Sequence, residues 1–285
     1  MKKIIAGAVM AAVALTLIWL NTYTLYVYDA LLFIASAYAL YEMASAFGKQ
    51  GYKVIKAPLI AAAAALYPAI LFFGTGGLTA VVLLCFVAGG IIYVLRDDIT
   101  FKDFLATVAS LAYPLLFLSA GYLLNHAGGS FLLLFALLIA LITDTGAYFV
   151  GRTANAITKN TAKKLIPRVS PKKTVAGAIG GVVVCAAVII LYWYLIEYGG
   201  GVIDLGYKLQ DVISVSDAWV LPAYILIALA ASVISQLGDL FASRIKRECG
   251  IKDFGNLIPG HGGVIDRVDA VMFVIAAVYA VTVIF

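Results

Sequence analysis

The stretch VAGAIGGVVVCAAVIILYWYLI, residues 175–196, contains no charged residue and follows directly on the basic segment SPKKT, residues 170–174. A helix needs about 20 predominantly apolar residues to cross the hydrocarbon core of a bilayer, and this stretch is long enough. Lipid offers no partners to the hydrogen-bonding groups of an irregular backbone. We therefore expect this stretch to be a membrane-spanning α-helix.

The rest of the chain has the same character. Of its 285 residues, 64% are hydrophobic and 12% are charged, and the mean hydropathy is +1.04. This is too apolar for a soluble domain and predicts an all-α polytopic membrane protein. The three cysteines, Cys85, Cys185 and Cys249, show no metal-binding spacing, and we expect free thiols.

Length and hydropathy predict nine spans. The third and fourth are separated only by GTGG, residues 74–77. The basic N-terminus resembles a signal peptide, but Ile18, Trp19 and Leu20 stand where a cleavage site would need small residues, so we expect a retained first span. The nine spans are 4–20, 25–47, 57–73, 78–95, 103–124, 130–151, 175–197, 218–241 and 266–285.

The basic residues predict the orientation. With a cytoplasmic N-terminus and nine crossings, every one of the 20 Lys and Arg except Lys208 lies on the cytoplasmic side, as the positive-inside rule requires. We expect a multi-pass protein of the cytoplasmic membrane with its active site facing the cytoplasm. Residues 1–130 would form spans 1–5, and residues 131–285 a catalytic region of spans 6–9 with cytoplasmic loops 152–174 and 242–265.

Four carboxylates lie at or near the cytoplasmic ends of spans: Asp144, Asp239, Asp266 and Asp269. Any one of them alone also fits a helix-end carboxylate or a buried ion pair with a neighbouring Arg, and for Asp269 this alternative stays open. Together they predict ligands for Mg²⁺, with room for a second cation, because clustered carboxylates bind hard cations that bridge to phosphates. We expect Asp239 and Asp266 to converge, and Asn at either to lower turnover without loss of stability.

Glycines and cations complete the pattern. Gly260, Gly262 and Gly263 allow close backbone approach just before a helix N-terminus, which favours an anion. Lys172 and Lys173 neutralise phosphate oxygens in one interpretation and are snorkelling or headgroup-binding cations in the other. Metal, cations and backbone donors together predict a phosphoryl- or nucleotidyl-transfer site.

One long motif carries a resemblance to a known family. SRIKRECGIKDFGNLIPGHGGVIDRVD, residues 243–269, resembles the signature of the phosphatidate cytidylyltransferases, the CDP-diacylglycerol synthases. SQLGDL at 235–240, DTGAYFVGR at 144–152 and KLIPRVSPKKT at 164–174 support it. The resemblance covers residues 144–285. Ala176 and Ala242 depart from it, since relatives carry polar or acidic residues there.

The resemblance implies an enzyme that transfers the cytidylyl group of CTP to phosphatidate and releases pyrophosphate. It implies CTP, phosphatidate and membrane lipid as partners, a homodimer, and no nucleic acid. The catalytic or phosphate-binding side chains that it implies within the motif are Ser243, Lys246, Arg247, Lys252, Asp253, His261 and Arg267.

Two rival functions remain at this point. One is a CTP-dependent enzyme that acts on another lipid phosphate or alcohol. The other is an ion-coupled transporter with Asp144 and Asp239 in its cation pathway. Binding of CTP would separate enzyme from transporter. Glu42, at the end of the second span, either pairs with Lys49 or lines the cavity, and the sequence does not decide between them.

Overall fold

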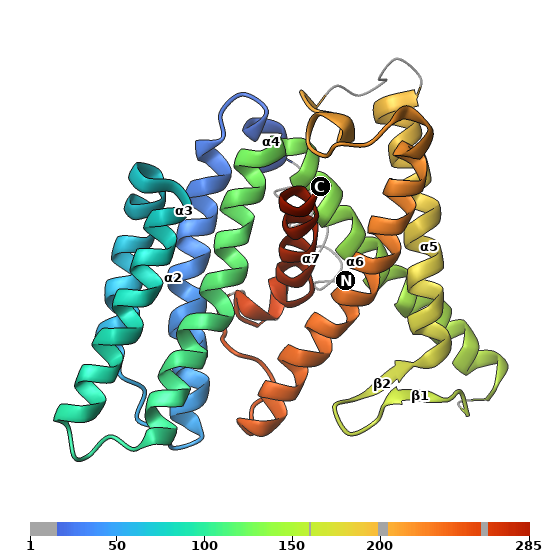
Figure 1. The fold of residues 1–285 in the computed structure, drawn as a ribbon. Coiled ribbons are helices and arrows are strands. Elements are labelled where there is room, and N and C mark those ends of the chain that lie inside the picture. The colour runs from blue at the N-terminus through green and yellow to red at the C-terminus, as the bar shows by residue number, and fades with distance from the viewer. Residues whose placement is uncertain (1–15, 160, 199–204, 258–261) are drawn as a thin grey trace. The chain divides into compact units, whose positions relative to one another are not determined.

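The computed structural model describes residues 16–159, 161–198, 205–257 and 262–285. These residues are helical almost throughout, and among them six helices are long and apolar enough to cross a membrane. Figure 1 shows their arrangement along the chain. The prediction of a helical membrane protein is therefore confirmed. The long helices are α2 (Tyr26–Lys49), α3 (Lys56–Leu95), α4 (Phe101–Ile157), α5 (Val175–Trp193), α6 (Asp217–Glu248) and α7 (Ile265–Ile284).

The two longest helices are each interrupted by glycine. In α3, Gly74 has φ 57° and ψ −138°, and in α4, Gly129 has φ 53° and ψ −142°. Glycine tolerates positive φ because it has no Cβ. Both breaks fall between two predicted spans, at 74–77 and 125–129. The count of nine spans stays a prediction, since most of the first, 4–20, lies outside the described residues.

The loop predicted at 152–174 contains regular structure. Helix α4 continues to Ile157, and strands β1 (Lys164–Ile166) and β2 (Ser170–Thr174) then form an antiparallel hairpin. The hairpin leads directly into α5 (Figure 1). A one-turn π-helix, η1 (Tyr194–Tyr198), follows α5, and a short 3-10 helix, η2 (Leu209–Asp211), precedes α6.

The loop predicted to begin at residue 242 begins later, because α6 continues to Glu248 and includes Ser243, Lys246 and Arg247. Hydropathy marks where a chain leaves lipid, whereas a helix ends where its hydrogen bonding ends. Here Gly250 adopts φ 66°. Its N–H donates to Arg247 O and the N–H of Ile251 donates to Lys246 O, which is the Schellman arrangement.

The chain divides into two compact units. The first comprises Met1–Tyr28, Ala120–Arg244 and Val268–Phe285, and the second comprises Asp29–Ser119 and Ile245–Arg267. Each unit draws on distant parts of the sequence. The predicted functional division between residues 130 and 131 stays a prediction.

An aromatic cluster forms part of the core of the first unit. Phe135 stacks with Tyr192 at 5.6 Å between ring centroids and meets Tyr224 edge-on at 5.4 Å. The Tyr192 hydroxyl donates to Phe131 O at 3.0 Å. Such aromatic pairs contribute about 0.5–1.5 kcal/mol each beyond their buried area. The cluster joins α4, α5 and α6, the helices that carry the pocket described below.

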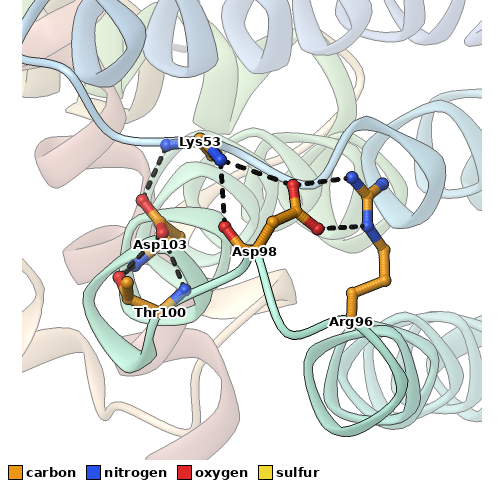
Figure 2. A network of polar contacts seen from close by, with 5 residues as sticks. All are labelled: Lys53, Arg96, Asp98, Thr100 and Asp103. Carbon is orange, nitrogen blue, oxygen red and sulfur yellow. Dashed lines mark hydrogen bonds and ion pairs between the residues drawn. The ribbon is translucent and has the colours of Figure 1, made fainter.

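In the second unit a polar network fixes the start of α4 (Figure 2). Arg96 Nε and Nη2 donate to the two carboxylate oxygens of Asp98 at 3.0 and 2.9 Å, and Lys53 Nζ lies 3.4 Å from Asp98 Oδ2. The backbone N–H groups of Lys53 and Thr100 donate to Asp103. The hydrogen bonds from Arg96 lower the pKa of Asp98. The network ties the segment before α3 to the beginning of α4.

Candidate functional site

One face of α4 lines a pocket of about 790 Å³ in the first unit. Asp144, Tyr148, Arg152 and Asn155 line it, and their spacing of three or four residues places them along one side of the helix. The other walls come from the hairpin, the start of α5, and α6. The pocket is therefore built from segments up to 95 positions apart, between Asp144 and Asp239.

The basic wall of this pocket is the end of β2. Lys172 and Lys173 line it, and Thr174, the last residue of the strand, is also the N-cap of α5. The buried Thr174 Oγ1 accepts a hydrogen bond from the Gly177 N–H at 3.0 Å. The N-terminus of a helix carries a partial positive charge and unsatisfied N–H groups. Two ammonium groups beside such a terminus make this wall suited to a phosphate.

The acidic part of the pocket contains Asp144 and Asp239. Lys173 Nζ lies 2.5 Å from Asp239 Oδ2, and Ser243 Oγ donates to Asp239 Oδ1 at 3.2 Å. The structure thus brings together four residues that the sequence singled out, Asp144, Lys172, Lys173 and Asp239, and connects Ser243 to them. A pocket that contains both lysine and aspartate side chains can bind an anionic ligand through the lysines and the cation of that ligand through the aspartates.

Two glycines allow α4 and α5 to approach closely. A Cβ at Gly177 would lie 2.6 Å from Ala147 O, and one at Gly181 would lie 2.7 Å from Thr143 O. Both neighbours are backbone atoms, which cannot turn aside as a flexible side chain would. The absence of a side chain at these positions fixes the start of α5 against the face of α4 that carries Asp144.

Side-chain hydrogen bonds join α6 to the same pair of helices. Gln236 Nε2 donates to Ala178 O at 3.1 Å, and Thr143 and Ser232 share a buried hydrogen bond of 2.7 Å. A buried hydrogen bond is costly to leave unmade, so these contacts favour one relative placement of the helices. Together with the glycine contacts they fix the three helices that carry Asp144, Lys173 and Asp239.

In the second unit the signature motif is organised around Asp266. Asp266 Oδ1 lies 2.8 Å from Lys246 Nζ, and Oδ2 accepts the N–H groups of Phe254 and Gly263 at 2.7 and 3.0 Å. The side chain of Asp266 is 2% exposed. The Lys246 ammonium also lies 5.4 Å above the ring of Phe254. The carboxylate therefore holds both ends of the segment between residues 254 and 263.

A cation ligated by Asp266 would have to displace at least part of this network. Asp239 and Asp266 belong to different units, and their predicted convergence stays a prediction. Asp269 packs through its backbone, since its carbonyl oxygen would lie 2.8 Å from a Cβ at Gly238.

The remaining motif residues are mostly at the surface. Gly262 has φ 90°, a conformation that favours glycine. Gly260 and His261 lie outside the described residues, so their predicted roles are untested. Among the side chains that the resemblance implies as catalytic or phosphate-binding, the described ones that are exposed are those of Arg247, Lys252, Asp253 and Arg267.

Sequence reasoning missed Tyr148, Asn155 and Gln236 as pocket residues. The first two could have been found by stepping along the helical face from Asp144. Gln236 could not, because its place depends on how α6 packs against α5. The sequence did not decide the partner of Glu42, and the contacts of this residue are described below.

The donor set of the pocket fits Mg²⁺ with its substrate. Among the described residues no group of three or more His, Cys, Asp or Glu side chains is placed to hold a metal ion. Mg²⁺ is usually held by one or two carboxylates, with waters and substrate phosphates completing its octahedron. Asp144 and Asp239 meet that requirement only when a phosphate ligand also binds.

Comparison with known proteins decides the family. The model of the Cytidylyltransferase family matches residues 1–285. The chain belongs to this family. It is 32% identical over 183 residues to a phosphatidate cytidylyltransferase of Staphylococcus haemolyticus, and the match covers 63% of this chain and 59% of the relative.

Two further relatives carry the same description. A Staphylococcus saprophyticus phosphatidate cytidylyltransferase is 33% identical over the same shares of the two chains. The corresponding Staphylococcus epidermidis protein is 38% identical over 143 residues, which is 50% of this chain and 45% of the relative. The chain thus spans about three fifths or less of the length of these relatives.

Proposed function

We propose that this cytidylyltransferase-family protein transfers the cytidylyl group of CTP to phosphatidate, forming CDP-diacylglycerol and pyrophosphate. The observation that carries the proposal is the pocket in which Lys172 and Lys173 adjoin the N-terminus of α5 and Asp239. Such a pocket suits a polyphosphate with a bound cation. The names of the staphylococcal relatives support CTP-dependent chemistry and phosphatidate as the acceptor.

In the proposed reaction an oxygen of the lipid phosphate attacks the α-phosphorus of CTP, and the bond to pyrophosphate breaks. Lys172, Lys173 and Arg152 neutralise phosphate oxygens, and the partial positive charge at the N-terminus of α5 favours the same anion. As the ligand enters, the ammonium group of Lys173 leaves Asp239 and pairs with a phosphate oxygen instead. A phosphate monoester is already nucleophilic at neutral pH, so the reaction requires no strong general base.

Asp144 and Asp239 are the proposed Mg²⁺ ligands. The bound cation would supply charge stabilisation for the departing pyrophosphate. Roles for Asp266, Asp269 and a second cation, and phosphate contacts from Lys246, Arg247, Lys252, His261 and Arg267, remain proposals that follow from the motif. Dimerisation is a further proposal from the same resemblance.

We further propose nine crossings with a cytoplasmic N-terminus. As one straight helix the 57 residues of α4 would extend roughly 85 Å at 1.5 Å per residue. That is far more than the roughly 30 Å of hydrocarbon in a bilayer. The break at Gly129 supports two crossings in α4, and the break at Gly74 supports two in α3. The basic hairpin would then face the cytoplasm.

The function is tested with the purified full chain in lipid nanodiscs. Labelled CTP is supplied with phosphatidate, with a prenyl phosphate, with diacylglycerol, or with no added lipid. We expect label in lipid, with one pyrophosphate released per product, only when phosphatidate is present. Label transferred only to another acceptor would identify the rival enzyme. Absence of CTP binding would overturn the proposal and favour transport.

A further inference from the structure

Glu42 lies in α2, far in sequence from the signature motif, yet it binds that motif directly. Its side chain is buried, with the residue 3% exposed. Oε1 accepts the N–H of Val264 and Oε2 accepts the N–H of Ile265, both at 2.9 Å. Glu42 and both N–H groups belong to the second unit. Each carboxylate oxygen of Glu42 therefore has a backbone partner in the motif.

The position of these N–H groups explains why a carboxylate is used. Ile265 is the first residue of α7, and the first N–H groups of a helix have no partner within it. A negative charge at this end is also favoured by the helix dipole. Glu42 thus acts as an N-cap supplied by another helix, where most caps come from the adjacent residue.

Two glycines of the motif are shaped to the same carboxyl group. A Cβ built on Gly255 or on Gly263 would come closer than 3.0 Å to Glu42 Oε1, and the three nearest atoms in each case all belong to Glu42. Neither glycine has a positive φ that would itself demand glycine. Their lack of a side chain makes room for the Glu42 carboxylate.

Asp266 holds the same segment from within the motif. It accepts the N–H groups of Phe254 and Gly263, next to the glycine at 255 and the N–H groups at 264 and 265 that Glu42 contacts. Two buried carboxylates therefore hold this part of the motif: Asp266 accepts N–H groups at both ends of the segment, and Glu42 accepts the next two N–H groups after Gly263.

We propose that Glu42 is a positioning residue of the signature motif, which fixes the backbone at 263–265 without touching substrate. A role of Glu42 in turnover rests on the proposed cytidylyl transfer. The effect of Glu42 on the backbone of the motif is independent of that proposal. Gln at this position can offer only one acceptor oxygen and must direct its NH₂ group towards a backbone N–H. The consequence is a loosened start of α7.

The first test measures hydrogen exchange of the full chain in nanodiscs, by mass spectrometry of peptides that contain Val264 and Ile265. Losing a hydrogen bond to a charged acceptor should speed exchange there about ten- to a hundredfold in Glu42→Gln. Glu197→Gln is the matched control, because Glu197 accepts the N–H of Leu209 in the other unit. Unchanged exchange at 264 and 265 in Glu42→Gln overturns the proposal.

The second test is a double-mutant cycle, and its single variant Gly263→Ala keeps the proposal testable if Glu42→Gln does not fold. Gly263→Ala alone should speed the same exchange, because its methyl group meets Glu42. In a Glu42→Ala background that methyl has room, so Gly263→Ala should add little. Additive effects would show that Gly263 does not depend on Glu42 and would overturn the proposal.

Kinetics then separate the two proposals. If wild-type protein makes CDP-diacylglycerol, Glu42→Gln should lower kcat/KM while Glu197→Gln leaves it near the wild-type value. Wild-type inactivity with altered exchange in Glu42→Gln would reject the proposed function and retain the positioning role. Normal kcat/KM together with faster exchange would reject the positioning role in catalysis.

Discussion

Lys173 and Asp239 form an ion pair, with 2.5 Å between Nζ and Oδ2, that joins strand β2 to helix α6. Their side chains are only 27% and 28% exposed, so solvent screens the pair incompletely. The charge of Asp239 is thus already compensated before a ligand arrives. In the proposed reaction, a phosphate that attracts Lys173 would release Asp239 for a cation, and a cation at Asp239 would release Lys173 for a phosphate.

Replacing Lys172 and Lys173 together with Gln is expected to raise the KM for CTP about ten- to a hundredfold, because losing one charge-assisted contact to phosphate costs roughly 1.5–3 kcal/mol. Steady-state kinetics at saturating phosphatidate provide the measurement. Lys208→Gln, on the opposite side of the membrane in the proposed topology, is the control. An unchanged KM in the double variant would instead indicate that Lys172 and Lys173 bind lipid headgroups.

Asp144→Asn and Asp239→Asn should each lower kcat by orders of magnitude and raise the Mg²⁺ concentration needed for half-maximal rate. Asn keeps the shape of the side chain but removes the charge that holds a hard cation. Titration of the rate with Mg²⁺ checks this, and Asp98→Asn, which breaks an exposed ion pair in the other unit, serves as the control. Near-normal Mg²⁺-dependent turnover in both variants would contradict the assignment.

Asp266→Asn should lower the thermal stability of the protein, whereas the sequence alone predicted a loss of turnover with unchanged stability. Its carboxylate is buried and binds Lys246 and two backbone N–H groups, so the change removes the negative charge that faces the Lys246 ammonium group. Breaking a buried pair costs about 3–5 kcal/mol. We expect a clear fall in thermal stability as well as turnover. A variant with wild-type Tm and no activity would instead support a direct metal-binding role.

Gly181→Ala should weaken the packing of α4 against α5. The new methyl would lie 2.7 Å from Thr143 O, and overpacking of this kind costs about 1–3 kcal/mol. Thermal unfolding in detergent measures the loss. Gly90→Ala in α3 is the matched control, because no described residue would lie within 4 Å of its Cβ. Equal Tm values for the two variants would contradict the close approach.

The topology is tested with single cysteines at Thr161 and at Gln210 in a chain whose three native cysteines are replaced. The native thiols are all buried, and burial raises the pKa of Cys249 and lowers its reactivity. A membrane-impermeant reagent added to intact cells should label position 210 and spare position 161. Labelling of position 161 alone would reverse the orientation.

Much of the fold could be predicted from the sequence because the bilayer imposes a simple rule on length and composition. The helix beginning at Val175 and the glycine breaks at Gly74 and Gly129 follow from hydropathy and backbone freedom. The hairpin at 164–174 could not be predicted from hydropathy, and the end of α6 at Glu248 depended on the turn at Gly250.

The candidate site was predictable in part for a similar reason. Asp144, Lys173 and Asp239 are polar residues beside apolar spans, where a charge is costly and so conspicuous. Gln236 and Glu42 are just as polar but owe their roles to packing between distant segments. The sequence shows that such residues are polar, but it does not show which distant residues they contact.

The double role of Thr174, last residue of β2 and cap of α5, has a consequence for the kinetics of ligand capture. No flexible joint separates the two lysines from the helix, so their backbone is ordered before an anion arrives. Binding an anion therefore costs little backbone conformational entropy in this segment. Association should therefore proceed in one concentration-dependent phase in stopped-flow measurements, without the slow second phase that a folding loop would add.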